Sequence, residues 1–100
     1  MVKHIVFWKL KESAHGNSAA ENAKIIKEKL EALGGKIDGL IHIEVGLDFS
    51  AGEASCDLAL YSEFKSKEAL SYYQEHPLHK AILPFVAEAR TERRVVDYEK

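Results

Sequence analysis

The sequence predicts a single α+β domain over residues 1–100, in which two helices cover one face of a four-stranded antiparallel sheet. Three observations predict this architecture. A chain of 100 residues is long enough for one hydrophobic core and too short for two. Apolar and charged residues make up 46% and 30% of the chain, an ordinary balance for a folded protein. The apolar positions follow strand and helix periods in the order strand, helix, strand, strand, helix, strand.

The first strand and the first helix have clear local signals. Residues 2–11, VKHIVFWKLK, are rich in β-branched and aromatic residues and are apolar on both faces of a strand. Ser18, followed three positions later by Glu21, is a capping-box signature that opens a helix. Apolar residues then recur at helical spacing until Gly34 and Gly35, which predict the end of the helix.

The second and third strands follow, joined by the polar segment SAGEAS. The second strand is predicted at residues 40–49, and its apolar face is predicted to consist of Ile41, Ile43, Val45 and Leu47. This alternation is typical of a half-buried edge strand. The third strand is predicted at residues 56–64, CDLALYSEF, and it is again apolar on both faces.

The last third of the chain predicts a broken helical segment and a final strand. Ser66 caps a second helix, KEALSYYQEH, and Pro77 restarts it, because proline suits a first helical position and disfavours helix in the preceding residue. The continuation, LHKAILPFVAEA, is predicted to be a short helix bent at Pro84. Residues 90–100, RTERRVVDYEK, form the fourth strand.

This order of elements predicts the ferredoxin-like βαββαβ topology, with the first and third strands in the centre of the sheet. Two helices cover only one face, so Ile5, Phe7, Ala59 and Tyr61 are expected to line the other. An apolar patch on a small domain usually marks an interface, and two-fold dimers are the commonest solution. We therefore predict a homodimer whose sheets pack face to face.

Charge and cysteine content exclude several classes of protein. A net charge of -2 and a pI near 6.2 argue against a nucleic-acid-binding surface. Cys56 is the single cysteine, so no internal disulfide and no cysteine pair for zinc are expected, as in a reducing cytoplasm. The longest apolar run, IVFW, is too short for a signal peptide, and no membrane partner is predicted.

Four segments resemble one known family: VKHIVFWKLK, GLDFSAGEASCDLALYSEFKSKEAL, YYQEHPLHKA and VVDYE. In order and spacing the chain is similar to the stress-responsive A/B barrel domain (Dabb) family. The resemblance implies the ferredoxin-like fold and a dimeric α/β barrel made from two sheets. It also implies that no reaction is assigned to most members, while one enzymatic branch resembles plant olivetolic acid cyclase, which closes a polyketide ring without metal or cofactor.

The resemblance to that cyclase suggests candidate catalytic residues. Tyr73 and His79 fall on the positions of its acid-base pair, Asp97 on the carboxylate that orients the histidine, and His4 on a histidine of the first strand. In such a site the imidazole removes a proton next to a carbonyl and the phenol stabilises the enolate oxygen. This chain differs where it has Leu58 in place of a histidine and Arg93 in place of an apolar residue, which argues against polyketide cyclisation itself.

Several interpretations of these residues remain open at this point. A histidine bonded to an aspartate can simply fix a helix end, and His76 beside Pro77 can act as a helix cap. His76 and His79 are three positions apart, but zinc needs further ligands, so neither a metal nor a cofactor is predicted. The chain is predicted to bind a small apolar ligand in a cavity of each subunit. One alternative is a cofactor-independent lyase, cyclase or isomerase acting on a small carbonyl compound through His79 and Tyr73. Another is an assembly or stress-protective protein that binds no ligand.

Overall fold

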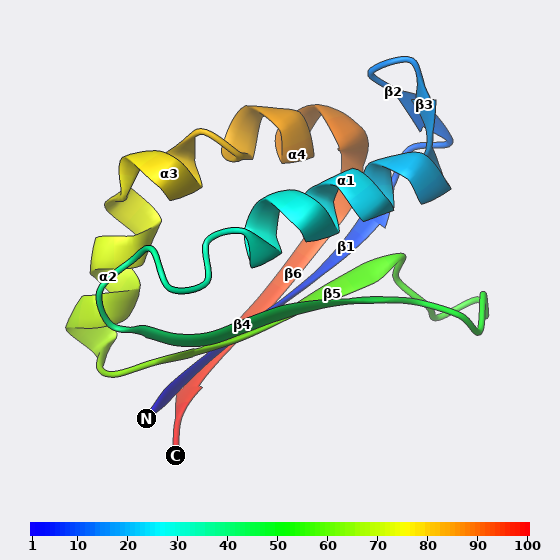
Figure 1. The fold of residues 1–100 in the computed structure, drawn as a ribbon. Coiled ribbons are helices and arrows are strands. Elements are labelled where there is room, and N and C mark those ends of the chain that lie inside the picture. Colours follow the sequence, from blue (N-terminus) through cyan, green and yellow to red (C-terminus); the bar gives the residue numbers. More distant parts are fainter.

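The computed structural model describes all 100 residues and contains one sheet with a layer of helices above it (Figure 1). The strands of this sheet are β1 (Val2–Leu10), β4 (Leu40–Leu47), β5 (Leu58–Phe64) and β6 (Arg90–Glu99). The helices are α1 (Ala19–Glu31), α2 (Lys67–Glu75), α3 (Pro77–Lys80) and α4 (Leu83–Ala89). A short hairpin of β2 (Ser13–Ala14) and β3 (Asn17–Ser18), which the sequence did not predict, precedes α1.

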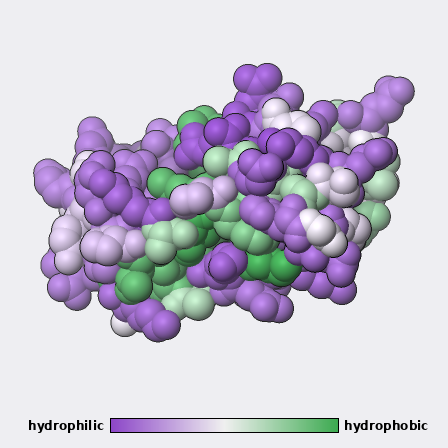
Figure 2. All heavy atoms as spheres, turned by 90° about the horizontal axis from the view of Figure 1, so that it is seen from above, coloured by the Kyte–Doolittle hydropathy of each residue, from purple (hydrophilic) through white to green (hydrophobic).

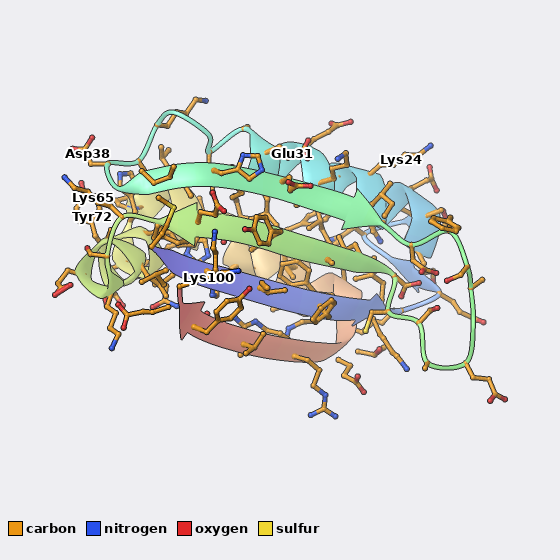
Figure 3. All side chains as sticks on the ribbon, turned by 90° about the horizontal axis from the view of Figure 1, so that it is seen from below. Lys24, Glu31, Asp38, Lys65, Tyr72 and Lys100 are labelled. Atoms are coloured by element: carbon orange, nitrogen blue, oxygen red, sulfur yellow. The ribbon has the colours of Figure 1, made fainter.

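The sheet has the predicted ferredoxin-like topology. Its strand order is β4-β5-β1-β6, and all three neighbouring pairs are antiparallel. The first and third strands of the predicted order are therefore central, as expected. All helices lie on one side of the sheet (Figure 1), and the strands are uncovered when the molecule is viewed from the other side (Figure 3).

The core lies between the sheet and the helices because the central strands alternate in burial. On β1 the buried side chains are Val2, His4, Val6, Trp8 and Leu10. The residues predicted to line the other face are less buried than these: Ile5, Ala59 and Tyr61 are half-buried, and Phe7 is 40% exposed. The pleat of a strand sends successive side chains to opposite faces, so a single alternation produces both the core and the open apolar face.

Helix starts are held by the predicted caps. The Ser18 hydroxyl accepts from the backbone N–H of Glu21, and the Glu21 carboxylate accepts from the backbone N–H of Ser18, which completes the capping box. The Ser66 hydroxyl likewise caps α2. Pro84 differs from the prediction: it lies in the first turn of α4, so the chain forms two short helices there rather than one bent helix.

The edge strand β4 departs from the predicted alternation. Leu40 pairs with Phe64 and His42 pairs with Glu63, so Ile41 is an extra residue in a bulge and is 54% exposed. The prediction that Ile41 belongs to the buried face was wrong. The bulge shifts the register by one residue. Leu40 and Val45 are therefore both buried, although a regular strand would place residues five apart on opposite faces.

Helix α1 protects the free edge of β4. The Glu31 carboxylate accepts from the backbone N–H of Val45 (3.0 Å), and the Lys27 ammonium donates to the Val45 carbonyl (2.5 Å). The Lys27 ammonium and the Val45 N–H both lower the pKa of Glu31. These contacts occupy backbone groups that would otherwise be open to another strand, which directs assembly away from this edge.

The turn before β4 depends on Gly39, and we expect Gly39→Ala to lower the free energy of unfolding by about 2–4 kcal/mol. Gly39 has φ +86°, and a Cβ there would lie 2.5 Å from Cβ of Ala69 in α2. Urea denaturation measures this loss. Gly16→Ala is the matched control, because Gly16 also has positive φ (+76°) but no atom near the added Cβ. Equal losses in the two variants would contradict the proposed clash.

Candidate functional site

A cavity of about 390 Å³ lies between the helices and the covered face of the sheet. Nine of its 14 lining residues are hydrophobic, so it suits an apolar molecule. The 14 lining residues come from all four helices and from strands β1, β5 and β6, together with Ile82 between α3 and α4. Figure 2, which views the helical side, shows hydrophobic side chains gathered through the middle of this face among hydrophilic ones.

The cavity has a buried floor and an exposed mouth. His4, Trp8 and Tyr73 are among the floor residues, with exposed fractions of 3%, 5% and 0%. Gln74 and Arg93 line the cavity and are exposed. A small molecule entering from solvent would therefore pass charged and amide groups before it reaches the apolar interior.

Two polar groups of the floor have no hydrogen-bond partner within the chain. These are the indole Nε1–H of Trp8 and the hydroxyl of Tyr73, and both atoms are buried. Buried polar groups are almost always paired, and an unpaired one costs about 1–3 kcal/mol. Both side chains line the same cavity, so an acceptor atom in that cavity is the natural partner for either group.

Tyr73 is a neutral phenol in this cavity. Burial raises the pKa of its phenol well above the usual range, because the phenolate would lose its solvation, while the charge of Arg93 opposes this shift. The hydroxyl therefore stays protonated at any physiological pH. It can donate to a ligand oxygen but cannot serve as a base.

His4 is held by Asp97 on the neighbouring strand. The two residues are directly paired between β1 and β6, and His4 Nδ1 lies 2.5 Å from Asp97 Oδ1. A carboxylate favours Nδ1 as the donor, which turns Nε2 away from Asp97. Asp97 was expected to orient His79, the histidine of the cyclase pair. The structure corrects this, since Asp97 orients His4.

His79 is oriented by the backbone instead. Its Nδ1 lies 3.2 Å from the carbonyl oxygen of Gln74, and because a carbonyl only accepts, Nδ1 carries the proton and Nε2 the lone pair. Burial lowers the pKa of His79, and nearby His4 and Arg93 lower it further, although the bond to Gln74 opposes the shift. His79 is therefore a neutral imidazole at neutral pH.

The structure brings three of the four candidate residues together around the cavity. The rings of Tyr73 and His79 are 4.3 Å apart between centroids, and those of His4 and Tyr73 are 6.3 Å apart. Asp97 lies behind His4 and is not part of the lining. The local sequence pattern gives no sign that the indole N–H of Trp8 is left without a partner.

His76 has a separate, structural role. Its Nδ1 accepts from the backbone N–H of Leu78 (3.1 Å) at the start of α3, which confirms the predicted cap. No group of three or more His, Cys, Asp or Glu side chains is arranged to hold a metal ion. No helix is both long enough and apolar enough to span a membrane.

Comparison with known proteins agrees with the fold. Residues 2–100 match the family described as the Stress responsive A/B Barrel Domain. The chain belongs to this family. An uncharacterized protein of Streptomyces coelicolor is 31% identical over 99 residues, which are 99% of both chains. Together these matches cover nearly the whole of the given sequence.

Solved structures of similar proteins extend the comparison. A dimeric protein of unknown function with a ferredoxin-like fold from Bacteroides fragilis is 39% identical, with a TM-score of 0.87, covering 99% of this chain and 95% of that one. The hydroxynitrile lyase of Passiflora edulis superposes with a TM-score of 0.80 at 19% identity, covering 97% and 90%. At that identity the lyase shows only that the stress-responsive A/B barrel protein shares its fold.

Proposed function

We propose that the stress-responsive A/B barrel protein is a cytoplasmic homodimer that binds a small, mostly apolar molecule in the cavity of each subunit. The observation that carries this proposal is the pair of buried, unpartnered donors, Trp8 Nε1–H and the Tyr73 hydroxyl. A ligand with an acceptor oxygen would satisfy one or both of them while its apolar part fills the hydrophobic interior. Buried polar groups are rarely left unpaired, so a bound acceptor would account for both groups in this one cavity.

The dimer in this proposal is supported by the uncovered face of the sheet. Three apolar side chains on that face are 40–48% exposed: Phe7 on the central strand β1, and Val96 and Tyr98 on β6. Apolar side chains at the middle of an open sheet favour a second sheet as their cover. The relative from Bacteroides fragilis is described as dimeric, which agrees with this arrangement.

Tyr73→Phe tests the binding site, because it separates a ligand donor from a structural hydroxyl. The hydroxyl has no partner in the chain, so its removal is expected to stabilise the free protein by about 1 kcal/mol. The same change is expected to weaken ligand binding about tenfold, through loss of a hydrogen bond. Thermal shift assays with a panel of small aromatic ketones and phenols, followed by calorimetry, measure both effects.

Tyr72→Phe is the matched control, since Tyr72 is the adjacent residue of α2 and is 53% exposed. It should change neither stability nor binding. A Tyr73→Phe protein that is less stable than the wild type, and binds equally well, would show that the hydroxyl is structural. That result would remove the main support for the cavity as a ligand site.

A second function, acid-base catalysis, is favoured by the tautomer of His79. The hydrogen bond at Nδ1 leaves Nε2 of the neutral His79 as an acceptor, and His79 and Tyr73 both line the cavity. A neutral imidazole beside a phenolic donor could remove a proton next to a carbonyl while Tyr73 stabilises the enolate oxygen. The predicted class is a cofactor-independent lyase, cyclase or isomerase acting on a small carbonyl compound.

A further inference from the structure

The charged groups of the cavity lining all have one sign. Arg90 and Arg93 belong to the lining, and no aspartate or glutamate does. The third arginine of the chain, Arg94, forms an ion pair with Glu92 (3.6 Å), whereas neither Arg90 nor Arg93 forms one. Arginine guanidinium groups beside a cavity without a carboxylate are an unusual feature for a site that would bind only neutral molecules.

The strand register places Arg93 at a defined end of the cavity. Arg93 is directly paired with Trp8 across β1 and β6, so the two side chains leave neighbouring positions on the covered face of the sheet, and both line the cavity. Asp97, the only carboxylate nearby on this face of β6, is paired with His4 four residues along the strand. That spacing corresponds to about 13 Å between the two Cα atoms. The Asp97 carboxylate is already bonded to His4 and is not part of the cavity lining.

We propose that the ligand is a small organic carboxylate whose acid group binds at the Trp8 and Arg93 end of the cavity. Its two oxygens match two kinds of donor there, a guanidinium and an indole N–H, and its apolar body reaches inward over Val6 and Leu60. This inference rests on the proposed function and specifies its ligand class. A carboxylate has the planar geometry that a guanidinium binds best.

The charge of Arg93 reaches the rest of the site. It lowers the pKa of His79 and opposes the upward shift in Tyr73, so its field extends to both side chains. Burial is the larger cause of the lowered pKa of His79 and would persist with an anion bound at Arg93.

A matched pair of probes, 2-naphthoate and 2-naphthamide, tests the ligand class, because the two differ mainly in charge. We expect the carboxylate to bind the wild-type protein about tenfold more tightly at low salt, and the difference to shrink at higher salt. Arg93→Gln should abolish the preference. Arg94→Gln is the matched control, since Arg94 is the next residue of β6, points to the opposite face and should leave the preference intact.

The outcomes separate this inference from the proposed function. If both probes bind equally, and both are weakened by Trp8→Phe, the cavity is a ligand site but the carboxylate inference is wrong. If the carboxylate preference survives Arg93→Gln, the assigned position of the acid group is wrong. If neither probe binds the wild-type protein at millimolar concentration, the proposed site itself is contradicted.

Discussion

Phe7→Glu is expected to dissociate the proposed dimer into monomers. The side chain lies on the central strand β1, faces the open side of the sheet and is 40% exposed in the single chain. Packing two sheets face to face would bury it near the middle of the interface. A carboxylate there loses its hydration, and we expect the dissociation constant to rise by about 100-fold or more.

The folded monomer should tolerate this change. Phe7 is paired with Ala59 on β5 and with Arg94 on β6, so a carboxylate at this position faces a guanidinium across the strand pair. Opposite charges in directly paired positions stabilise antiparallel strands slightly. The variant should therefore keep its strand and helix content while losing its partner.

Leu78→Glu is the matched control for the dimer experiment. Leu78 is apolar and 44% exposed, but it lies in α3 on the helical side of the sheet. Sedimentation equilibrium from 1 to 100 µM should give the wild type and this control twice the 11.2 kDa mass of one chain. Wild-type protein that remains a single chain throughout that range would rule out the proposed dimer.

The local pattern of the sequence was sufficient to predict the fold and part of the site. Strict alternation along residues 2–11 placed His4 and Trp8 on one face, and the structure shows both in the cavity floor. Capping signals at Ser18 and Ser66 located two helix starts correctly. These features depend on neighbours within a few residues, so the sequence carries them directly.

The partners of the site residues could not be predicted in the same way. Asp97 bonds to His4 because β1 and β6 pair in one particular register, although the two residues are 93 positions apart. The orientation of His79 depends on the break at Pro77, which brings its Nδ1 to the carbonyl of Gln74 five residues earlier. Both contacts follow from tertiary packing, which no local pattern specifies.

Arg93 illustrates a signal that was only partly used, because it was noted as a charged residue where the cyclase has an apolar pocket residue and not as a possible ligand contact. It differs from Asp97 by four residues on one strand, so the two must share a face, and Asp97 was already a site candidate. Extending the alternation along residues 90–100 would have placed this guanidinium beside the cavity. No comparable signal predicted the bulge at Ile41, because the apolar residues from Ile41 to Leu47 alternate regularly along the sequence.

If the site performs acid-base chemistry, His79→Gln is expected to lower the rate of proton removal by at least about 100-fold. The assay is deuterium exchange from solvent into the carbon next to the carbonyl of small ketones and 1,3-dicarbonyl compounds, followed by NMR. The neutral His79 is the active form, so the rate should fall as the pH drops below its lowered pKa. Activity should therefore persist to a pH below about 6.5, the ordinary histidine value.

His76→Asn is the control for that variant, because His76 lies outside the cavity lining and asparagine can still cap α3. A wild-type protein with no exchange above the uncatalysed rate would leave binding as the function of the cavity.

Asp97→Asn then decides which histidine is the base. Asp97 contacts His4 and not His79, so the substitution should disturb the tautomer of His4 while the bond from His79 to the Gln74 carbonyl remains. Exchange that survives Asp97→Asn and is lost in His79→Gln assigns the base to His79. Exchange that survives His79→Gln and is lost in Asp97→Asn assigns the base to His4. The catalytic pair would then be His4 of β1 and Asp97 of β6.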